Sequence, residues 1–497
     1  LDLMDFREWL AVCGAYRDSI YGSPVVQALY DSMFQYCEGD RRRPSYGAGT
    51  AAQAVVRLYG TYKDSFAFEM QAGMGEVVVT PVYRVLKQRG VKFQFFHKLK
   101  KIRLNTSKTS VSRIEFYRQV CLRNGNYDPT IAPERCNGYL ECWPDAPLWD
   151  QIIDGDDPTV RCLDFESYWC SYHVDTATLQ QGLQFDAVIL AIPLGAFKKL
   201  NTAPGPCDEL IAASERFRAM TEMATLVPTI AVQAWCNWDV MQLGWPPNVA
   251  VVASGATNKT VLSTGPEPLD IWADMSQVLK YEPWHPYPEG PKSLQYLCSV
   301  LETELFRAPP DDDCVLARAK LLARERAITW FSDKARYLWP NSCAGGYFDW
   351  TILFDPSGAQ GSDRVDAQMY RANVDPSNCC VGSPAGSTQW RLATDASGFG
   401  NLYLAGTWID CGFNTECIEA AVISGLQAAR AVAATSSAIP GEDFLQFGND
   451  LPALITLAAE EAIALVEATA EAAWGSGEAP MARRKTGSRY ETRKGRR

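Results

Sequence analysis

The residues best placed to do chemistry lie near the C-terminus, where a short apolar run stops at a glycine and a helix rich in small residues follows. The run is 402–405, the glycine is Gly406, and the expected helix starts near Glu419. A strand that ends in glycine and leads into a helix lets a ligand phosphate or sugar approach the backbone, and the helix N-terminus favours negative charge. The same spacing is equally typical of an ordinary strand-loop-helix unit whose helix packs closely on the sheet.

Other kinds of catalytic centre leave no recognisable pattern. The three histidines, His97, His173 and His285, are far apart in sequence, so zinc-ligand spacing is absent and no metal is expected. The 16 cysteines include no C-x-x-C motif, although Cys379 and Cys380 are neighbours. We interpret most of them as small buried apolar residues in a reducing compartment.

A dinucleotide site normally appears as a strand, a G-x-G-x-x-G turn and a helix, and the chain has no convincing copy of this motif. The candidate at Gly47 follows an Arg-Arg-Arg-Pro stretch, which is no buried strand. The candidate at Gly73 has Val78 where the last glycine belongs, and the one at Gly398 precedes a strand. Each is interpreted as a turn.

Length, composition and charge favour a globular protein and argue against some other classes of protein. At 497 residues, 47% hydrophobic and 11% aromatic, the chain suits a globular protein of two or three domains. Residues 481–497 hold eight Lys or Arg and one Glu, so this +7 segment leaves −18 for the rest. An acidic body argues against nucleic-acid binding. No signal peptide and no apolar run of membrane-spanning length is present, so a cytoplasmic protein without a transmembrane segment is expected.

Hydrophobic periodicity predicts a mixture of helices and strands. Residues 1–70 are expected to be mostly helical, and 123–180 and 332–400 irregular. Further helices are expected at 76–89, 208–224, 315–331 and 451–474, and strands at 91–96, 99–104, 113–122, 185–193 and 226–237. The run 185–193 is apolar at successive positions, which is typical of a parallel strand buried on both faces.

The C-terminal segment resembles the FAD-contacting segment of the flavin amine oxidase and phytoene desaturase superfamily. There an apolar strand, Ala-Gly-Asp/Glu, a variable loop and Glu-Gly/Ala-Ala-Val-x-Ser-Gly precede a helix. The matching positions are Leu402, Leu404, Ala405, Gly406, Glu419, Ala420, Ala421, Val422, Ser424, Gly425 and Ala428. The chain departs from the family at Thr407, where relatives carry an acidic residue that binds the ribityl or phosphate region of the flavin. A threonine hydroxyl can still form a hydrogen bond there.

Two further segments carry the resemblance, in family order. Residues 72–91 followed by Leu99-x-x-Ile102 are similar to the Gly-Gly-Met and Val-x-x-Ile marks of the family, whose valine strand contacts adenine through its backbone. Residues 186–193 are similar to the Asp-x-Val-apolar-Ala-x-Pro strand. In relatives, a loop in the position of 384–391 lies near the flavin ring. A plain helix-strand pair and a generic buried strand are the alternatives, but three marks in order argue against coincidence.

The resemblance implies an α/β fold with an incomplete, discontinuous FAD/NAD(P)-binding domain and an α+β substrate domain. It extends over nearly all of residues 1–435 and is nearest to bacterial FAD/NAD(P)-binding oxidoreductases. The FAD-binding segments would be 71–122, 180–200 and 395–435, the substrate domain 1–70 and 201–394, followed by a helical extension at 436–475 and a disordered basic tail at 476–497. The phosphate-binding βαβ unit with the G-x-G-x-x-G turn is expected to be missing from this chain.

The function implied is an FAD-dependent oxidoreductase that oxidises a C–H bond of a small or apolar organic substrate by hydride transfer to the flavin. The expected FAD contacts are Leu99, Gly406, Thr407, Trp408, Glu419 and Ala420. No catalytic residue is assigned. The alternative is a flavin-less homologue that acts as a binding or interaction protein. A carrier of an apolar ligand is a third option, based on tryptophans that could line a cavity or simply fill the core: Trp143, Trp149, Trp235, Trp238, Trp272, Trp284, Trp339 and Trp350.

Overall fold

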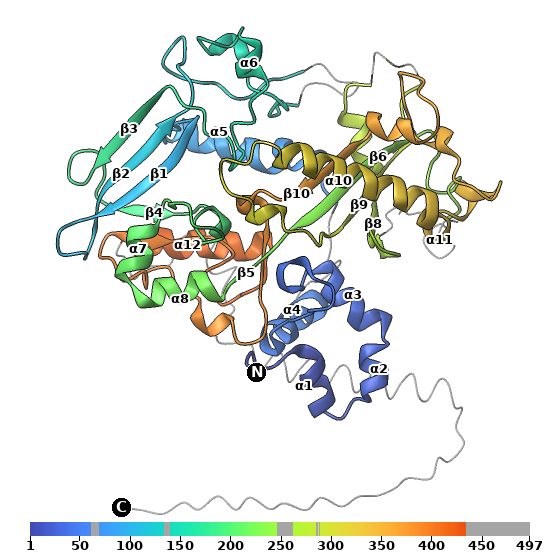
Figure 1. The fold of residues 1–497 in the computed structure, drawn as a ribbon, viewed down its shortest axis with the longest axis horizontal. Helices are drawn as coiled ribbons and strands as arrows, with labels where there is room; N and C mark the ends of the chain where they lie inside the picture. Colours follow the sequence, from blue (N-terminus) through green and yellow to red (C-terminus); the bar gives the residue numbers. More distant parts are fainter. Residues whose placement is uncertain (61–68, 134–139, 246–261, 285–286, 288, 434–497) are drawn as a thin grey trace, which may run out of the picture.

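The computed structural model describes residues 1–60, 69–133, 140–245, 262–284, 287 and 289–433, and it has a mixed α/β architecture with several small sheets (Figure 1). The predicted helix at 451–474, the extension and the basic tail lie outside the described residues, as does His285. Within the described part, no helix combines the length and the apolar character needed to cross a membrane.

The N-terminal segment is helical, as predicted. It forms α1 (Phe6–Val12), α2 (Arg17–Tyr21), α3 (Pro24–Ser32) and α4 (Ala48–Gly60). Asp5 caps α1 by accepting the backbone N–H of Arg7 at 2.9 Å, and Ser23 caps α3 ahead of its first-turn proline. Buried Tyr30, Tyr36 and Tyr46 form a small core beneath these helices.

The largest sheet is antiparallel and has the order β10-β6-β9-β8-β7. Its strands are β6 (Thr229–Cys236), β7 (Leu262–Thr264), β8 (Ile271–Asp274), β9 (Ser293–Val300) and β10 (Met369–Asn373). Helix α10 (Val315–Thr329), which was predicted, packs on β10 and β6 through the buried positions Ala319, Ala323 and Ala327. These alanines recur every four residues and form one helix face, so the helix can lie close to the sheet. Helix α11 (Ala335–Leu338) follows.

A second antiparallel sheet contains β1 (His97–Leu104), β2 (Val111–Arg118) and β3 (Asp175–Gln180). The predicted strands 99–104 and 113–122 are confirmed in β1 and β2, whereas β3 was not predicted because its side chains are mostly polar and exposed. The strand predicted at 91–96 is wrong. Phe93 and Phe95 pack edge-on against Tyr83 of helix α5 (Thr80–Gln88), and no strand of the described residues pairs with them.

A pair of parallel strands, β4 (Val188–Leu190) and β12 (Leu402–Leu404), lies next to the C-terminal helix α12 (Ile418–Ala433). The prediction of a parallel strand is confirmed in β4, but its burial on both faces is wrong, because Ile189 is 47% exposed. The predicted helix 208–224 divides into α7 (Asp208–Ala213) and α8 (Glu215–Met223), where Ser214 caps the second helix. The predicted strand 226–237 is interrupted by Pro228, which separates β5 (Thr225–Val227) from β6.

The remaining elements are short. Strand β11 (Cys380–Gly382) pairs with β5, and α6 (Pro158–Arg161) lies in the irregular segment after β2. Short 3-10 segments lie at Cys37–Gly39, Trp149–Gln151, Leu194–Ala196, Ser276–Tyr281, Leu305–Arg307, Pro340–Cys343, Trp350–Ile352, Gly361–Ala367, Pro376–Asn378 and Thr388–Trp390, and π-helical turns at Gly75–Val79 and Trp330–Lys334. One large core cluster joins the two antiparallel sheets to β4, β12 and α12.

Candidate functional site

The carboxyl ends of β4 and β12 meet at one edge. Leu402 is paired with Val188 and Leu404 with Leu190, and the N–H of Ala405 donates to the carbonyl of Leu190 at 3.1 Å. The chain therefore leaves both strands at the same level, toward Pro193 on one side and Gly406 on the other. In parallel α/β sheets, ligands bind outside this carboxyl edge. Two of the three segments that carry the family resemblance are thus brought together.

Gly406 occupies a position that only glycine fits. Its φ is +136°, and a Cβ built there would lie 2.5 Å from Nε1 of Trp408. Its N–H donates to Oγ of Ser424 at 2.8 Å, and that hydroxyl donates to the carbonyl of Ala421 at 2.7 Å. Helix α12 is therefore fastened directly to the end of β12. The small residues of the sequence motif make this close approach possible.

Trp408, an expected cofactor contact, is engaged by protein groups. Its side chain is buried, its indole N–H donates to the carbonyl of Ile192 at 3.1 Å, and its ring meets Phe197 edge-on at 5.4 Å. This hydrogen bond connects the loop after β12 to the loop after β4. Trp408 therefore holds the two carboxyl ends in register.

The carbonyl of Thr407 is bound by a buried cation. Nη1 of Arg391 donates to it at 2.5 Å, and Nη2 of the same side chain donates to Oγ of Ser383 at 2.9 Å. Burial lowers the pKa of the Arg391 guanidinium. Arg391 lies in the loop that resembles the flavin-ring loop of relatives, but it was not among the expected contacts, because a single arginine in a loop has no spacing that marks it.

Glu416 is a second charged residue beside this loop that the sequence did not single out. Its carboxyl accepts the backbone N–H of Val381 in β11. Desolvation of the carboxyl raises the pKa of Glu416 to about 7, although the residue as a whole is exposed and the Val381 hydrogen bond and the charge of Arg391 oppose the shift. A carboxyl that titrates near neutral pH can both accept and donate a proton, which is the property of a general acid or base.

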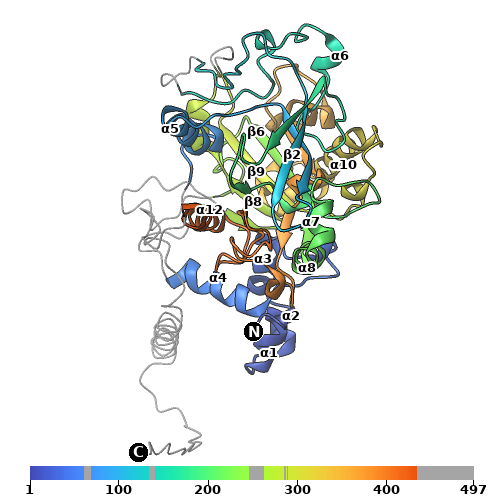
Figure 2. The same ribbon diagram turned by 90° about the vertical axis from the view of Figure 1, so that its left-hand side faces the viewer.

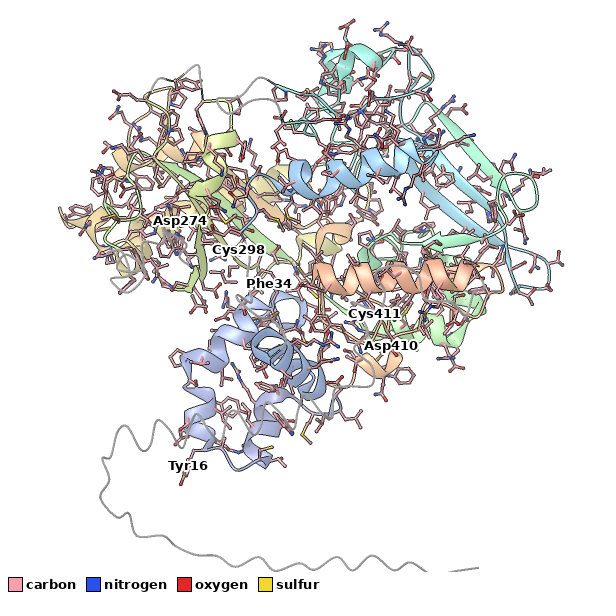
Figure 3. The ribbon with its side chains drawn as sticks, turned by 180° about the vertical axis from the view of Figure 1, so that it is seen from behind. Tyr16, Phe34, Asp274, Cys298, Asp410 and Cys411 are labelled. Atoms are coloured by element: carbon pink, nitrogen blue, oxygen red, sulfur yellow. The ribbon has the colours of Figure 1, made fainter. Side chains whose placement is uncertain are left out.

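The expected contacts at the start of α12 have different environments. Ala420 is fully buried, and its N–H donates to Sγ of Cys417 at 3.4 Å, whereas Glu419 is half-buried in the first helical turn. Figure 3 labels Asp410 and Cys411 in the loop that leads to this helix. A Cβ built on Gly412 of the same loop would meet nothing within 4 Å, so there is open space beside the loop.

Leu99, the expected adenine contact, lies on the three-stranded sheet opposite Phe116. That sheet is joined to β12 through Asn401, which accepts the N–H of Val111 at 2.8 Å and donates to its carbonyl at 2.9 Å. Leu99 packs against the core cluster that also contains Leu404. The described hydrogen bonds and ring contacts do not place it at the Gly406 edge.

Other candidate groups have ordinary structural partners. The Nδ1 atoms of His97 and His173 lie within hydrogen-bond distance of backbone carbonyls two residues earlier. In the described residues, one trio that could hold a metal is Asp312, Asp313 and Cys314, close to the surface before α10, where Asp312 already pairs with Arg318.

The tryptophans divide between the core and two cavities. Trp272 and Trp339 are fully buried. Trp143 and Trp149 line a cavity of about 610 Å³ with Phe95, Phe96 and Phe165. Trp235 and Trp284 line another of about 820 Å³.

One face around the parallel pair is apolar and uncovered. Ile189 of β4 is exposed, as are Ala187, Ala191 and Pro193, which flank the strand at alternate positions. Exposed apolar side chains also lie on α12 (Ile418, Val422 and Val432) and on α5 and the turn before it (Val79, Val82, Val85 and Leu86). Figures 2 and 3 show α5 and α12 on the same side of the molecule. We call these residues of β4, α12 and α5 the uncovered face.

The strand edges around this face differ. The outer edge of β12 is closed, because the N–H of Leu404 donates to the carbonyl of Thr394 at 2.8 Å and Ser397 donates to the carbonyl of Leu402 at 2.5 Å. Strand β4 pairs with β12 on one edge, and no described strand pairs with its other edge. A further parallel strand could therefore be added at β4 but not at β12.

A scan against protein-family models found no matching family, and a search of the curated proteins found no matching relative.

Proposed function

We propose that the chain is part of an FAD-dependent oxidoreductase of the amine oxidase-like class, which oxidises a C–H bond of a small or apolar organic substrate. The observation that carries the proposal is the common carboxyl edge of β4 and β12, which joins the Ala-Ile-Pro193 and Ala-Gly406 segments through the Trp408 hydrogen bond. Binding at such an edge follows from the open strand ends and the adjacent helix N-terminus.

The open edge of β4 and the uncovered face support the same proposal. A nucleotide-binding βαβ unit adds a parallel strand to a sheet and covers its faces with helices. Added at β4, it would cover Ile189 and the exposed apolar side chains of α5 and α12. Uncovered apolar patches of this kind mark interaction surfaces. The glycine-rich turn of such a unit would lie at the same carboxyl edge as Gly406.

The residues at the edge suit an anionic cofactor that must be held close to the backbone. The buried guanidinium of Arg391 supplies positive charge, and open space lies beside Gly412. The bound flavin would supply the hydride acceptor. The chain's own residues would orient the substrate and exclude water, and Glu416, whose pKa is about 7, could hold or accept a proton beside the loop.

One observation favours the alternative of a flavin-less binding protein. The N–H of Gly406 is already taken by Ser424 and the carbonyl of Thr407 by Arg391, and Thr407 replaces the acidic flavin contact of relatives. These backbone groups are therefore already hydrogen-bonded within the protein. In a flavin-less homologue, the carboxyl edge of β4 and β12 would bind a partner molecule without catalysing a reaction.

Absorbance of the purified protein distinguishes the two functions. The protein is expressed from its reading frame together with any in-frame sequence upstream of Leu1. The oxidoreductase is expected to show the visible bands of oxidised flavin, which bleach when dithionite is added without oxygen. A colourless protein that also fails to quench the fluorescence of added FAD would contradict the proposal and favour the alternative.

A further inference from the structure

An open cavity of about 820 Å³ lies beyond the carboxyl end of β6. Trp235, near the end of this strand, forms part of its wall, and Trp284, Tyr287 and Phe354 form the rest of its aromatic lining. Strand β6 begins at Thr229, next to β5, so the cavity lies about 20 Å along the strand from the β5–β11 pair that contacts Glu416. The cavity is therefore separate from the proposed flavin edge.

The aromatic rings that line the cavity meet one another at steep angles. Trp235 and Trp284 meet at 65° with centroids 6.0 Å apart, and Trp284 and Phe354 meet at 82° with centroids 5.5 Å apart. Tyr287 meets Phe354 at 79°. In such edge-to-face pairs the edge of one ring covers one face of its neighbour, and the opposite face of that neighbour is not used by the pair. The face of an aromatic ring carries negative charge density and attracts cations.

A carboxylate holds two of the rings. The same oxygen of Glu282 accepts the indole N–H of Trp235 at 3.0 Å and of Trp284 at 2.9 Å. The two hydrogen bonds fix the orientation of both indoles. They also place a carboxylate oxygen at the N–H edge of both indoles.

The polar part of the lining is acidic. Asp355, Asp363 and Asp366 line the cavity, and the described lining contains no lysine or arginine. Asp363 and Asp366 pair with Arg324, which is not a lining residue, so part of their charge is neutralised. Asp355 accepts the backbone N–H groups of Ser357 and Ala359, both at 2.8 Å. Partial burial acts against ionisation, but these hydrogen bonds and the charge of Arg364 lower the pKa of Asp355, so it is ionised at neutral pH.

We propose that this cavity binds an organic ammonium ion, with the cationic head against Trp235, Trp284 and Phe354 and Asp355 on its polar side. The volume suits a small molecule. A protonated or quaternary amine satisfies both parts of the lining, because its alkyl groups are apolar and its charge is positive. A neutral apolar ligand would match the aromatic part of the lining but not the acidic part. The proposal does not depend on the flavin.

A pair of isosteric probes tests it. Choline and its neutral carbon analogue 3,3-dimethylbutan-1-ol have nearly the same shape and differ in charge. Each is titrated into the full chain by calorimetry, with tryptophan fluorescence recorded in parallel. Saturable binding of choline, at least about tenfold tighter than that of the alcohol, is expected. Equal affinity for the two probes, or no saturable binding of choline, would overturn the proposal.

Variants locate the binding. Trp284→Leu, which removes a wall, is expected to weaken choline binding about tenfold, and Trp284→Phe, which keeps a ring, to weaken it less. Glu282→Gln removes charge while keeping an oxygen that can accept the indole N–H, and it provides a second test if Trp284→Leu does not fold. Trp149→Phe, in the other cavity, is the control and should bind choline normally. Unchanged binding in both Trp284→Leu and Glu282→Gln would rule out this cavity.

A second probe identifies the source of the cation. An acetylated trimethyllysine amide carries the same head group as choline but represents a protein side chain. Tighter binding of choline indicates a free small molecule, and tighter binding of the lysine derivative indicates a modified peptide.

Discussion

At the scale of single residues, Gly406 has the most specific requirement at the proposed edge. We expect Gly406→Ala to lower the free energy of unfolding by about 1–3 kcal/mol, because the backbone is at φ +136° and the new methyl would press on Trp408. Gly425→Ala is the matched control. It lies on the exposed side of α12 with nothing within 4 Å, and alanine should raise the stability by roughly 0.5–1 kcal/mol. Urea unfolding followed by circular dichroism measures both. Equal changes in stability for Gly406→Ala and Gly425→Ala would show that the backbone at Gly406 does not require a glycine.

Glu416 gives a pH-dependent prediction. Its pKa is raised from 4.5 to about 7 on folding, so the folded state holds the proton more tightly than the unfolded state between these values. The contribution of this carboxyl to stability is therefore greatest at low pH and declines as the pH rises toward 7. Glu416→Gln should be as stable as the parent near pH 4.5 and more stable at pH 8. A difference between the two proteins that is constant with pH would contradict the raised pKa of this carboxyl.

At the scale of elements, α10 shows how a residue pattern specifies packing. Ala323 is fully buried between the helix and the sheet, whereas Leu321 on the same helix is 56% exposed. We expect Ala323→Leu to cost about 1–3 kcal/mol through overpacking and Leu321→Ala to cost less than about 0.5 kcal/mol. Thermal unfolding of the two variants measures the difference. A larger loss of stability in Leu321→Ala than in Ala323→Leu would show that the Ala323 face of α10 does not pack against the sheet.

The same scale shows what the sequence could predict. Helix α10, strand β6 and the parallel strand β4 follow from local periodicity and were predicted. The end of β5 at Pro228 and the uncovered side of β4 depend on what lies beside a segment, which periodicity does not contain. The apolar side chains of 91–96 pack against aromatic rings and do not belong to a paired strand. Arg391 and Glu416 come from separate loops and interact electrostatically only after folding, so no spacing in the sequence joins them.

At the scale of the whole molecule, the proposed flavin site depends on the arrangement of the elements around β4 and β12. The parallel pair has one closed edge at β12 and, among the described strands, one open edge at β4. Helices α5 and α12 lie on the same side of the molecule (Figure 2). A flavin nucleotide at the carboxyl edge and an added βαβ unit at β4 would use both features. The cation cavity at the other end of β6 would be unaffected.

Hydrogen–deuterium exchange with and without FAD tests this placement most directly. It is measured on protein expressed with any in-frame sequence upstream of Leu1. We predict that FAD slows exchange at residues 188–193 and 405–420 and leaves residues 354–359 of the cation cavity unchanged. If FAD leaves exchange at 188–193 and 405–420 unaltered, or slows it only elsewhere, the carboxyl edge of β4 and β12 is not a flavin site.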